Sequence, residues 1–412
     1  MSKTLAVIGG GAAGFFCAVN AARLNNDLQV ILFEKTSKLL SKVRISGGGR
    51  CNVTHACFDI AEMSNRYPRG KNFVKKIFHQ FFTTDTIEWF QSRGVALKTE
   101  SDGRMFPVTD NSQSVIDCLL REANKYRVDI RMNREIKKLI RVNDQWQLLF
   151  SNGEELIADF VCIACGGYPK PEHFNWLTEV GHSFENPVPS LFTFNMPGNN
   201  ITALTGISVP QARIKVTGTK LEEQGPLLIT HWGMSGPAIL KLSAWGARWL
   251  HEKEYNFSIT VNWVPDLHQH EMQETLQSLR VERASRKIAV QNSFALPNRL
   301  WEYLLQQVSV LPDMLWSNLT SVQQNKLASI LCSQEFTVKG KTTYKEEFVT
   351  AGGIQLKEID ANTLQSKICK GVFFAGEILD VDGITGGYNF QHAWTTGWIA
   401  AKHIATKNLL HI

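Results

Sequence analysis

Residues 4–34 place a glycine-rich turn between two apolar segments, and no other feature limits the fold of this chain as strongly. Thr4–Ile8 (TLAVI) has the aliphatic and β-branched composition of a buried strand. The next six residues, GGGAAG, satisfy the G-x-G-x-x-G pattern, and apolar residues then recur at helical spacing. A second strand-like run, Gln29–Phe33 (QVILF), ends at Glu34. This order of strand, glycine turn, helix, strand and acid predicts a Rossmann-type dinucleotide-binding fold.

Each glycine of this pattern, and the acid that follows it, has its own physical task. Gly9 allows the tight turn, and Gly11 lets a pyrophosphate approach the backbone N–H groups at the start of the helix. Gly14 lets the helix pack closely against the strand. Glu34 is expected to accept hydrogen bonds from the adenosine ribose, and its negative charge disfavours a 2′-phosphate there.

A second glycine-rich segment near the C-terminus indicates which dinucleotide binds. Residues 371–377 (GVFFAGE) read as an apolar strand that ends in Gly376-Glu377, an arrangement that favours FAD over NAD. The glycines that follow, Gly383, Gly386 and Gly387, predict a loop that approaches a ligand closely. We expect a helix to begin near Asn389, with N–H groups able to stabilise negative charge on a reduced flavin. The cofactor fold is therefore expected to be built from both ends of the chain.

Composition excludes several other protein classes. The chain has 412 residues with 43% hydrophobic and 20% charged residues, which suits two or three globular domains. Its net charge of +6 and pI near 8.8 permit an anionic partner without demanding one. Eight scattered cysteines favour a reducing, cytoplasmic location over a disulfide scaffold, and their spacing predicts no metal site. We predict neither a signal peptide, because the glycine triplet would break its helix, nor a membrane-spanning segment.

Four blocks of sequence resemble the BaiN/RdsA-like (YhiN-like) family of FAD-dependent oxidoreductases. They are the N-terminal GGGAAG, KVRISGGGRCN at 42–52, GPLLITHWGMSGPA at 225–238 and FAGEILDVDGITGGYNFQ at 374–391. Shorter similarities lie at 103–107 (GRMFP) and 164–167 (ACGG), where Cys165 stands in place of the threonine expected at such a strand end. The resemblance covers essentially the whole chain and implies FAD as cofactor, with NAD(P)H as a transient reductant.

The resemblance and the pattern together predict an α/β fold with a two-part Rossmann-like FAD-binding domain and an inserted domain. We expect the FAD-binding parts at 1–190 and 338–412. The insertion, 191–337, is expected to hold a β-barrel-like sheet at 191–265 and helices at 266–337, since the apolar spacing changes from strand-like to helical. The substrate is expected to bind where the insertion faces the flavin.

Several further residues are expected at the cofactor. Arg50 follows three glycines, and its planar fork of donors suits phosphate oxygens, although it is also compatible with a simple surface charge. Lys42 is a second cation for the same task, and Lys35 either packs over adenine or is solvated. The other residues expected to line the flavin are Gly48, Gly49, Cys51, Asn52, Gly166, Asp382 and Asn389.

Three residues are candidates for catalysis, each with a structural alternative. Cys51 is either a redox or proton-donating thiol or a small residue packed beneath the cofactor, and packing is favoured. His231 is either a proton donor or a structural histidine. Arg104 either binds an anionic substrate or reductant or caps a turn. The CxxC pair of Cys162 and Cys165 lies on an apolar strand, so we expect packing there and no dithiol chemistry.

The resemblance implies reduction of an electron-poor carbon–carbon double bond, and the favoured substrate is a uridine of large-subunit ribosomal RNA, reduced to dihydrouridine. The alternatives are reduction of a small enone or steroid-like metabolite and a non-catalytic, flavin-containing RNA-binding or assembly factor. Two basic stretches are candidate RNA contacts, although such charges are more often simply solvated. Their residues are Arg66, Arg69, Lys71, Lys75 and Lys76, interleaved with Tyr67 and Phe73, and Arg280 and Arg283 on an expected helix.

Overall fold

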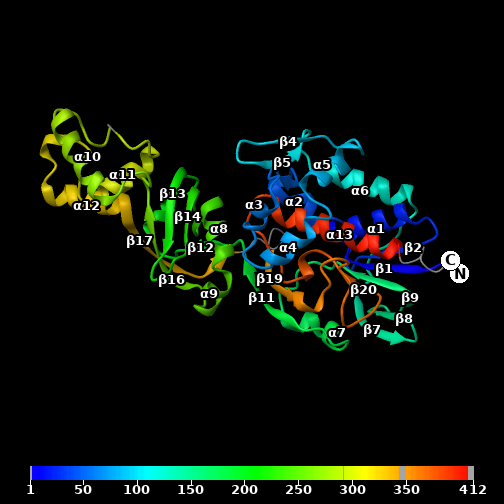
Figure 1. Cartoon of the computed structure of the whole chain (residues 1–412). Coiled ribbons are helices and arrows are strands. Elements are labelled where there is room, and N and C mark those ends of the chain that lie inside the picture. The colour runs from blue at the N-terminus through cyan, green and yellow to red at the C-terminus, as the bar shows by residue number, and fades with distance from the viewer. Residues whose placement is uncertain (1, 291, 343–348, 407–412) are drawn as a thin grey trace. The chain divides into compact units, whose positions relative to one another are not determined.

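The computed structural model describes residues 2–290, 292–342 and 349–406 and divides the chain into two compact units (Figure 1). Unit 1 comprises residues 1–189 and 345–412, and unit 2 comprises residues 190–344. Unit 1 therefore contains both ends of the chain, as a two-part cofactor domain with an insertion requires.

A five-stranded parallel sheet forms the centre of unit 1. Its order is β20 (Val372–Phe374), β10 (Phe160–Ile163), β1 (Thr4–Ile8), β2 (Gln29–Phe33) and β6 (Asp129–Arg131). The inner strands are almost entirely apolar and buried, since helices and loops cover both faces of a parallel sheet. The predicted Rossmann-like fold is confirmed, and β1 and β2 have the predicted bounds.

Two helices from opposite ends of the chain pack together in unit 1. They are α1 (Ala12–Leu24), blue in Figure 1, and α13 (Tyr388–Thr406), red. Close approach depends on Gly397 of α13, because a Cβ there would lie 2.7 Å from the Ala13 carbonyl oxygen. Beside them, the ring of Phe16 lies 4.6 Å from Trp89 and 5.2 Å from Trp394, between ring centres. This aromatic cluster holds the first and last helices of the cofactor domain together.

The other elements of unit 1 surround this centre. The helices are α2 (Ser41–Gly49), α3 (Ile60–Ser64), α4 (Lys71–Ile77), α5 (Thr83–Gln91), α6 (Gln113–Lys125), α7 (Asn175–Thr178) and the 3₁₀ segments η1 (Pro171–Phe174), η4 (Leu356–Glu358) and η5 (Gly376–Ile378). Three smaller sheets are formed by β3 (Thr54–His55), β5 (Arg104–Pro107) and β4 (Leu97–Thr99); by β7 (Ile136–Val142), β8 (Gln145–Phe150) and β9 (Glu155–Ala158); and by β11 (Phe184–Ser190) with β19 (Val349–Ile354).

Unit 2 contains a seven-stranded antiparallel sheet with helices. The sheet order is β17 (Gln334–Lys339), β16 (Asn256–Asn262), β13 (Ser208–Val216), β14 (Glu222–Thr230), β15 (Gly233–Ser235), β12 (Thr193–Asn195) and β18 (Lys341–Thr342). The helices are η2 (Asn200–Leu204), α8 (Pro237–Trp245), α9 (Ala247–Glu252), α10 (Gln269–Glu282), α11 (Asn298–Gln307), η3 (Trp316–Asn318) and α12 (Ser321–Ser333). An inserted domain of sheet and helices was predicted, and the fold confirms it.

Two details of the insertion differ from the sequence expectation. Helices α8 and α9 lie inside the segment expected to be β-rich, 191–265, where Gly236 and Pro237 mark the start of α8. The expected boundary at 337 falls within β17, which pairs with β16 from Asn256↔Lys339 to Val261↔Gln334. A chain cannot leave a sheet in the middle of a paired strand, so unit 2 continues past 337.

Candidate flavin-binding site

The carboxyl ends of four neighbouring parallel strands meet at one edge of the unit 1 sheet. Gly9 N–H donates to the Phe33 carbonyl (2.7 Å), Ala164 N–H to Ile8 (2.8 Å) and Ala375 N–H to Ile163 (3.0 Å). These bonds extend the sheet ladder just beyond β1, β2, β10 and β20. Ligands of open α/β sheets bind at this edge.

The first glycine turn combines close packing with open space. Gly9 has φ +118°, and a Cβ there would lie 2.3 Å from the Ala164 carbonyl oxygen. A Cβ on Gly14 would lie 1.9 Å from the Gly9 carbonyl oxygen, so α1 can approach the turn only with glycine at this position. A Cβ on Gly11 would meet no atom within 4 Å. Gly11 is the N-cap of α1. Because glycine has no side chain, no capping group lies between the first N–H groups of the helix and this space.

Glu34 is oriented by the same turn. Gly10 N–H donates to its Oε2 at 2.9 Å, while the N–H and hydroxyl of Thr36 both donate to Oε1 at 2.9 Å. The side chain is half-buried, and each carboxylate oxygen can accept further hydrogen bonds. Glu34 is thus placed at the end of β2 where the Rossmann pattern puts the acceptor for a ribose hydroxyl.

The second glycine loop ends the helical part of α2. Ser46 has the extended ψ of +147°, and Gly47, Gly48 and Gly49 all have positive φ. A Cβ on Gly47 would lie 2.7 Å from the Phe106 ring, whereas Gly48 and Gly49 would meet nothing within 4 Å. The glycines therefore permit a left-handed backbone and leave a bare main chain over two residues.

A salt bridge joins α2 to the end of β20. Lys42 Nζ donates to Glu377 Oε2 at 2.5 Å, and Thr350 N–H donates to Glu377 Oε1 at 2.9 Å. A Cβ on Gly167 would lie 2.7 Å from the Thr350 side chain. Glu377 thus connects segments from both parts of unit 1.

Lys35 Nζ lies 5.9 Å from the centre of the Tyr168 ring, at the edge of a cation–π contact.

These residues fit a bound dinucleotide. Gly11, Gly48 and Gly49 expose backbone next to space that a Cβ would fill, and Gly166 has only Glu377 Oε2 at 4.0 Å. Thr350 Oγ1 is buried and has no hydrogen-bond partner, although it lies against the glycine turn after β10. An unpartnered hydroxyl beside bare glycines matches a ligand rich in phosphate and ribityl oxygens.

Two asparagines expected at the flavin hydrogen-bond to the loops of the second and third glycine-rich segments. With its amide oriented to satisfy both atoms, Asn52 donates to the Thr54 and Met105 carbonyls (3.0 and 3.3 Å) and accepts from Gly387 N–H (3.0 Å). Asn389 accepts from Gly383 N–H (2.8 Å) and donates to the Gly383 carbonyl (2.9 Å). These amides hold the glycine loop before α13, because their donors and acceptors bind protein backbone.

Arg50 and Arg104 share a carboxylate above one aromatic ring. Arg50 Nη1 lies 2.6 Å from Glu100 Oε1, and Arg104 Nη2 lies 3.2 Å from Glu100 Oε2. Their guanidinium carbons lie 4.0 and 5.5 Å from the centre of the Phe106 ring. Arg104 also donates to Asp102 (2.7 Å). Arg50 Nη1 also lies 3.5 Å from Asp110 Oδ1, so three carboxylates pair with these two arginines, which are about one-third exposed.

The Cys51 thiol is buried rather than exposed. Its side chain is 0% exposed, and burial raises the pKa of the thiol to about 12, against a smaller lowering by Ser46. A thiol with this pKa is protonated at neutral pH and is a poor nucleophile. The structure thus favours the packing interpretation of Cys51. Cys162 is also buried and lies on β10, and all eight cysteines are free.

The predicted RNA-contact stretch at 66–76 is corrected at three positions. Arg69 and Asp382 form a salt bridge, and their side chains are only 10% and 0% exposed, so Arg69 is not available to RNA. Tyr67 is buried and donates to the Tyr388 carbonyl (2.7 Å), and Phe73 is 8% exposed, so neither ring can stack on a base. The remaining cations of the stretch, Arg66, Lys71, Lys75 and Lys76, are exposed.

The candidate residues of unit 2 are His231, Arg280 and Arg283. His231 is exposed on the turn between β14 and β15, where its ring lies 4.3 Å from that of Trp232. Arg280, on α10, donates to Gln324 Oε1 (3.0 Å), and Arg283 donates to the Ser293 hydroxyl (3.0 Å). Their predicted roles stay predictions.

Sequence reasoning missed two residues, His55 and Gln391, around the glycine loop before α13. His55 stacks on Tyr388 at 4.8 Å, and its Nδ1 lies 3.0 Å from the Gly386 carbonyl oxygen. Gln391 is wholly buried, and its Oε1 accepts from the Thr54 and Thr86 hydroxyls (2.6 and 3.0 Å). The presence of polar residues inside the glycine-rich blocks was the available signal, but their partners are distant in sequence.

A buried Ser-His-Glu constellation also occurs in unit 1. His182 Nδ1 lies 3.0 Å from Glu358 Oε2, and His182 Nε2 lies 3.1 Å from Ser366 Oγ. All three side chains are buried, and Ser366 Oγ accepts the N–H groups of Ile368 (3.0 Å) and Cys369 (2.8 Å). A hydrolytic nucleophile must be reachable and bonded mainly to its base, so this constellation is structural.

The protein-family profile described as "HI0933-like protein Rossmann domain" matches residues 3–403, nearly the whole chain. The chain belongs to the HI0933-like family. The predicted resemblance to the BaiN/RdsA-like oxidoreductases is confirmed, because relatives of both kinds align with it from end to end. This HI0933-like chain is accordingly an FAD-dependent oxidoreductase, as predicted.

Several relatives align with this chain over almost their full length. The ribosomal RNA dihydrouridine synthase of Haemophilus influenzae is 29% identical, covering 97% of this HI0933-like chain and 98% of the relative. The 3-dehydro-bile acid delta(4,6)-reductase of Clostridium scindens is 26% identical, covering 98% and 99%. Among solved structures, a 3-ketosteroid-delta4-(5alpha)-dehydrogenase from Rhodococcus jostii RHA1 has a TM-score of 0.52 at 10% identity, covering 98% and 97%. That likeness shows the shared fold.

The described residues contain neither a candidate membrane span nor a candidate metal site. Within the described part of the HI0933-like chain, no helix is long and apolar enough to cross a membrane. The same residues hold no group of three or more His, Cys, Asp or Glu side chains that could bind a metal ion.

Proposed function

We propose that this protein uses NAD(P)H to reduce the carbon–carbon double bond of a uridine in large-subunit ribosomal RNA, giving dihydrouridine. The observation that carries this proposal is the end-to-end match to two proteins named ribosomal RNA dihydrouridine synthase, from Haemophilus influenzae and Escherichia coli, each 29% identical. The exposed lysines of α4 support an anionic substrate.

Bound FAD supplies hydride transfer, and the residues of this chain supply binding, orientation and a proton. Gly11 and the first N–H groups of α1 hold the pyrophosphate, and Glu34 accepts from the adenosine ribose. The bare backbone at Gly48 and Gly49 admits the cofactor closely. Reduction of the double bond requires one hydride from NAD(P)H and one proton, so the product gains two hydrogens.

The remaining predicted site residues take the following roles in this proposal. Lys42 and Glu377 hold the two parts of the cofactor domain at the ligand. Arg50 and Arg104 contact phosphates of the reductant or of RNA only by leaving their carboxylate partners Glu100, Asp102 and Asp110. His231 donates the proton to the reduced base. Replacement of His231 by alanine is expected to lower kcat while leaving the FAD content unchanged.

A second candidate function is reduction of a small enone or steroid-like molecule. The match to a bile acid delta(4,6)-reductase over 98% of the chain favours it. The two candidates differ in the acceptor that speeds NAD(P)H oxidation. Ribosomal RNA lacking this modification should accelerate oxidation under the first, and a 3-keto-4-ene steroid under the second.

The test compares ribosomal RNA from cells with and without the gene for this protein. Nucleoside mass spectrometry should find one dihydrouridine in the large-subunit RNA only when the protein is present. Identical nucleoside profiles in both strains would exclude ribosomal RNA as the substrate and leave the steroid-like alternative. A non-catalytic role in ribosome assembly predicts identical profiles together with an RNA-independent rate of NAD(P)H oxidation.

A further inference from the structure

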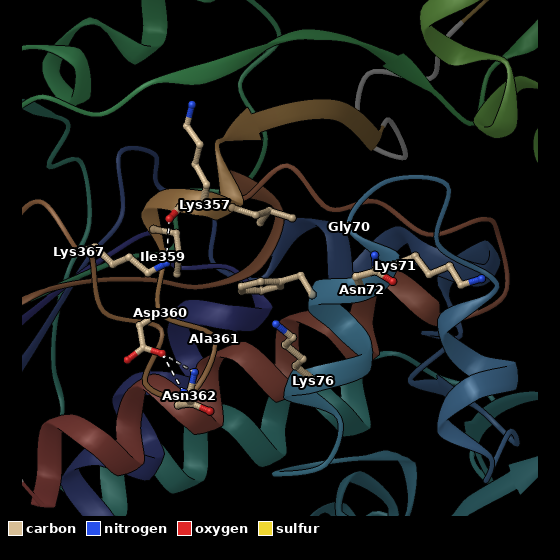
Figure 2. Close-up of a pocket in the computed structure, with 12 residues that line it drawn as sticks. Gly70, Lys71, Asn72, Lys76, Lys357, Ile359, Asp360, Ala361, Asn362 and Lys367 are labelled. Atoms are coloured by element: carbon tan, nitrogen blue, oxygen red, sulfur yellow. Dashed lines mark hydrogen bonds between the residues drawn. The ribbon is translucent and has the colours of Figure 1, made fainter.

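A hollow of about 780 Å³ opens on the surface of unit 1 between two segments distant in sequence (Figure 2). One wall is α4, with Lys71 and Lys76, and the other is the segment 356–367, with Lys357 and Lys367. Figure 2 shows Lys76 reaching from α4 into the space between the two walls. Among its lining residues the hollow has four lysines and one carboxylate, Asp360. Its charge is therefore strongly positive.

The lysines are not neutralised by neighbouring acids. In the part of the chain that the structure describes, none of the four forms an ion pair. Asp360 is engaged within its own turn: Oδ1 accepts from the N–H and side-chain amide of Asn362 (2.9 and 3.2 Å), and Oδ2 accepts from the Thr363 hydroxyl (3.2 Å). Four lysines without a paired acid on one small area of surface give a positive potential that attracts an anion.

The second wall is held in one conformation. Ile359 and Ser366 form an antiparallel bridge, and Lys367 N–H donates to the Glu358 carbonyl (2.8 Å). Lys367 Nζ donates to the Lys357 carbonyl (2.9 Å), which keeps these two lysines adjacent. Glu358 and Ser366 of this segment contact the buried His182, which ties the segment to the residues just before β11.

The two walls are also joined to each other. The Gln80 side-chain amide, which follows α4, donates to the carbonyls of Ala361 and Asn362 (3.4 and 3.2 Å). The spacing between the lysines of α4 and those of 357–367 is thereby set by the fold. The backbone of both walls is thus preorganised, and binding of an anion has to order only the lysine side chains.

We propose that this hollow binds consecutive phosphates of the RNA substrate, with Lys357 and Lys367 completing a site whose other wall is Lys71 and Lys76. This inference rests on the proposed function and names where the RNA backbone is held. Lysine ammonium groups contact phosphates as point charges and carry no base specificity. An acidic protein is a poorer occupant, because the one aromatic ring of the lining, Phe73, is 8% exposed and offers no apolar anchor.

The test measures binding of a fluorescent single-stranded fragment of large-subunit ribosomal RNA by anisotropy over a range of KCl concentrations. The variants are K357Q/K367Q, K71Q/K357Q and, as control, K137Q/K138Q, which removes the same charge from exposed lysines of β7. Each lysine lost from the hollow should lower the salt slope by about 0.7, so each double variant should lose about 1.4. At fixed salt, we expect about a tenfold weaker affinity for both hollow variants and less than a twofold change for the control.

The outcomes separate this inference from the proposed function. FAD content and the melting temperature show that the variants are folded, and K71Q/K357Q removes no side-chain hydrogen bond that the structure records. If the wild-type protein makes dihydrouridine but both hollow variants bind RNA like the control, the hollow inference is wrong and the proposed function stands. If the wild type neither binds nor reduces RNA, both fail. Equal displacement of the RNA by poly-glutamate of matched charge would assign the hollow to acidic proteins instead.

Discussion

Lys42 Nζ lies 2.5 Å from Glu377 Oε2, although 335 positions of sequence separate the two residues. Glu377 also accepts the Thr350 N–H (2.9 Å), so its carboxylate connects the N-terminal and C-terminal parts of the cofactor domain. The pair lies at the carboxyl end of the parallel sheet, where the glycine turns gather. Binding of FAD at this edge therefore depends on both ends of the chain.

The Lys42–Glu377 pair should contribute little to stability by itself. The Lys42 side chain is 46% exposed, so solvent screens the charge, and we expect a coupling free energy below about 1 kcal/mol. A double-mutant cycle with K42M, E377Q and both, followed by urea denaturation, measures it. E377Q alone should weaken FAD binding more than K42M, because Thr350 N–H also loses its charged acceptor. Equal FAD affinities for the two single variants would contradict this assignment of Glu377.

Two glycines of the same motif should respond oppositely to alanine. A methyl group on Gly11 meets no atom within 4 Å, so G11A should fold with an unchanged melting temperature and lose at least tenfold in FAD affinity. A methyl group on Gly14 would overlap the Gly9 carbonyl oxygen, so G14A should lower the free energy of unfolding by about 3 kcal/mol. Flavin absorbance and thermal melts distinguish the two effects. Loss of folding in G11A would show that the open space is required by the protein itself.

The buried His182–Glu358 pair should make stability fall on acidification. Burial lowers the pKa of His182 below its ordinary value of 6.5, against a smaller raising by Glu358. Burial would raise the pKa of Glu358, but the Ser183 N–H and His182 together lower it below 4.5. In both cases the unfolded chain takes up protons first, so stability is lost as pH falls, below about 6.5 for His182 and below about 4.5 for Glu358. Urea denaturation between pH 8 and 5 should show this decline, and H182Q should reduce it; an unchanged pH profile in H182Q would refute the assignment.

Cys51 should be dispensable for turnover. Its thiol is buried with a pKa of about 12, so iodoacetamide should not label it in the folded protein at pH 7. C51A should keep its FAD content and its rate of NAD(P)H oxidation, and lose about 1 kcal/mol of stability from the lost packing. C118A, which empties another buried thiol site, is the matched control. A turnover loss of a hundredfold in C51A alone would restore the catalytic interpretation.

The sequence predicts the parallel sheet and its glycine turn well for a physical reason. Strands buried on both faces, such as β1 and β2, require continuous apolar runs, and the turn after β1 requires glycine where no Cβ fits. These demands act on neighbouring residues, so they are visible in a short window. The start of α8 at Gly236 and Pro237 was visible in the same way but lay in a segment that otherwise alternates like strands.

Side-chain partners were less predictable because they come from distant parts of the chain. Asn52 binds Gly387, and Arg69 binds Asp382, each across more than 300 positions, so neither pairing has a local signature. Tyr67 and Phe73 alternate with cations as surface aromatics do, yet the fold buries both. The basic hollow likewise needs Lys357 and Lys367, which no local charge run marks.

The most direct test of the whole account is a reconstituted reaction. Purified FAD-loaded protein, NADPH or NADH, and large-subunit ribosomal RNA from cells lacking the gene are incubated together, with the same protein stripped of FAD as the control. We expect each dihydrouridine formed to be matched by one NAD(P)H oxidised, and neither to occur with the stripped protein. Oxidation of NAD(P)H without any gain of two hydrogens on uridine would contradict the account.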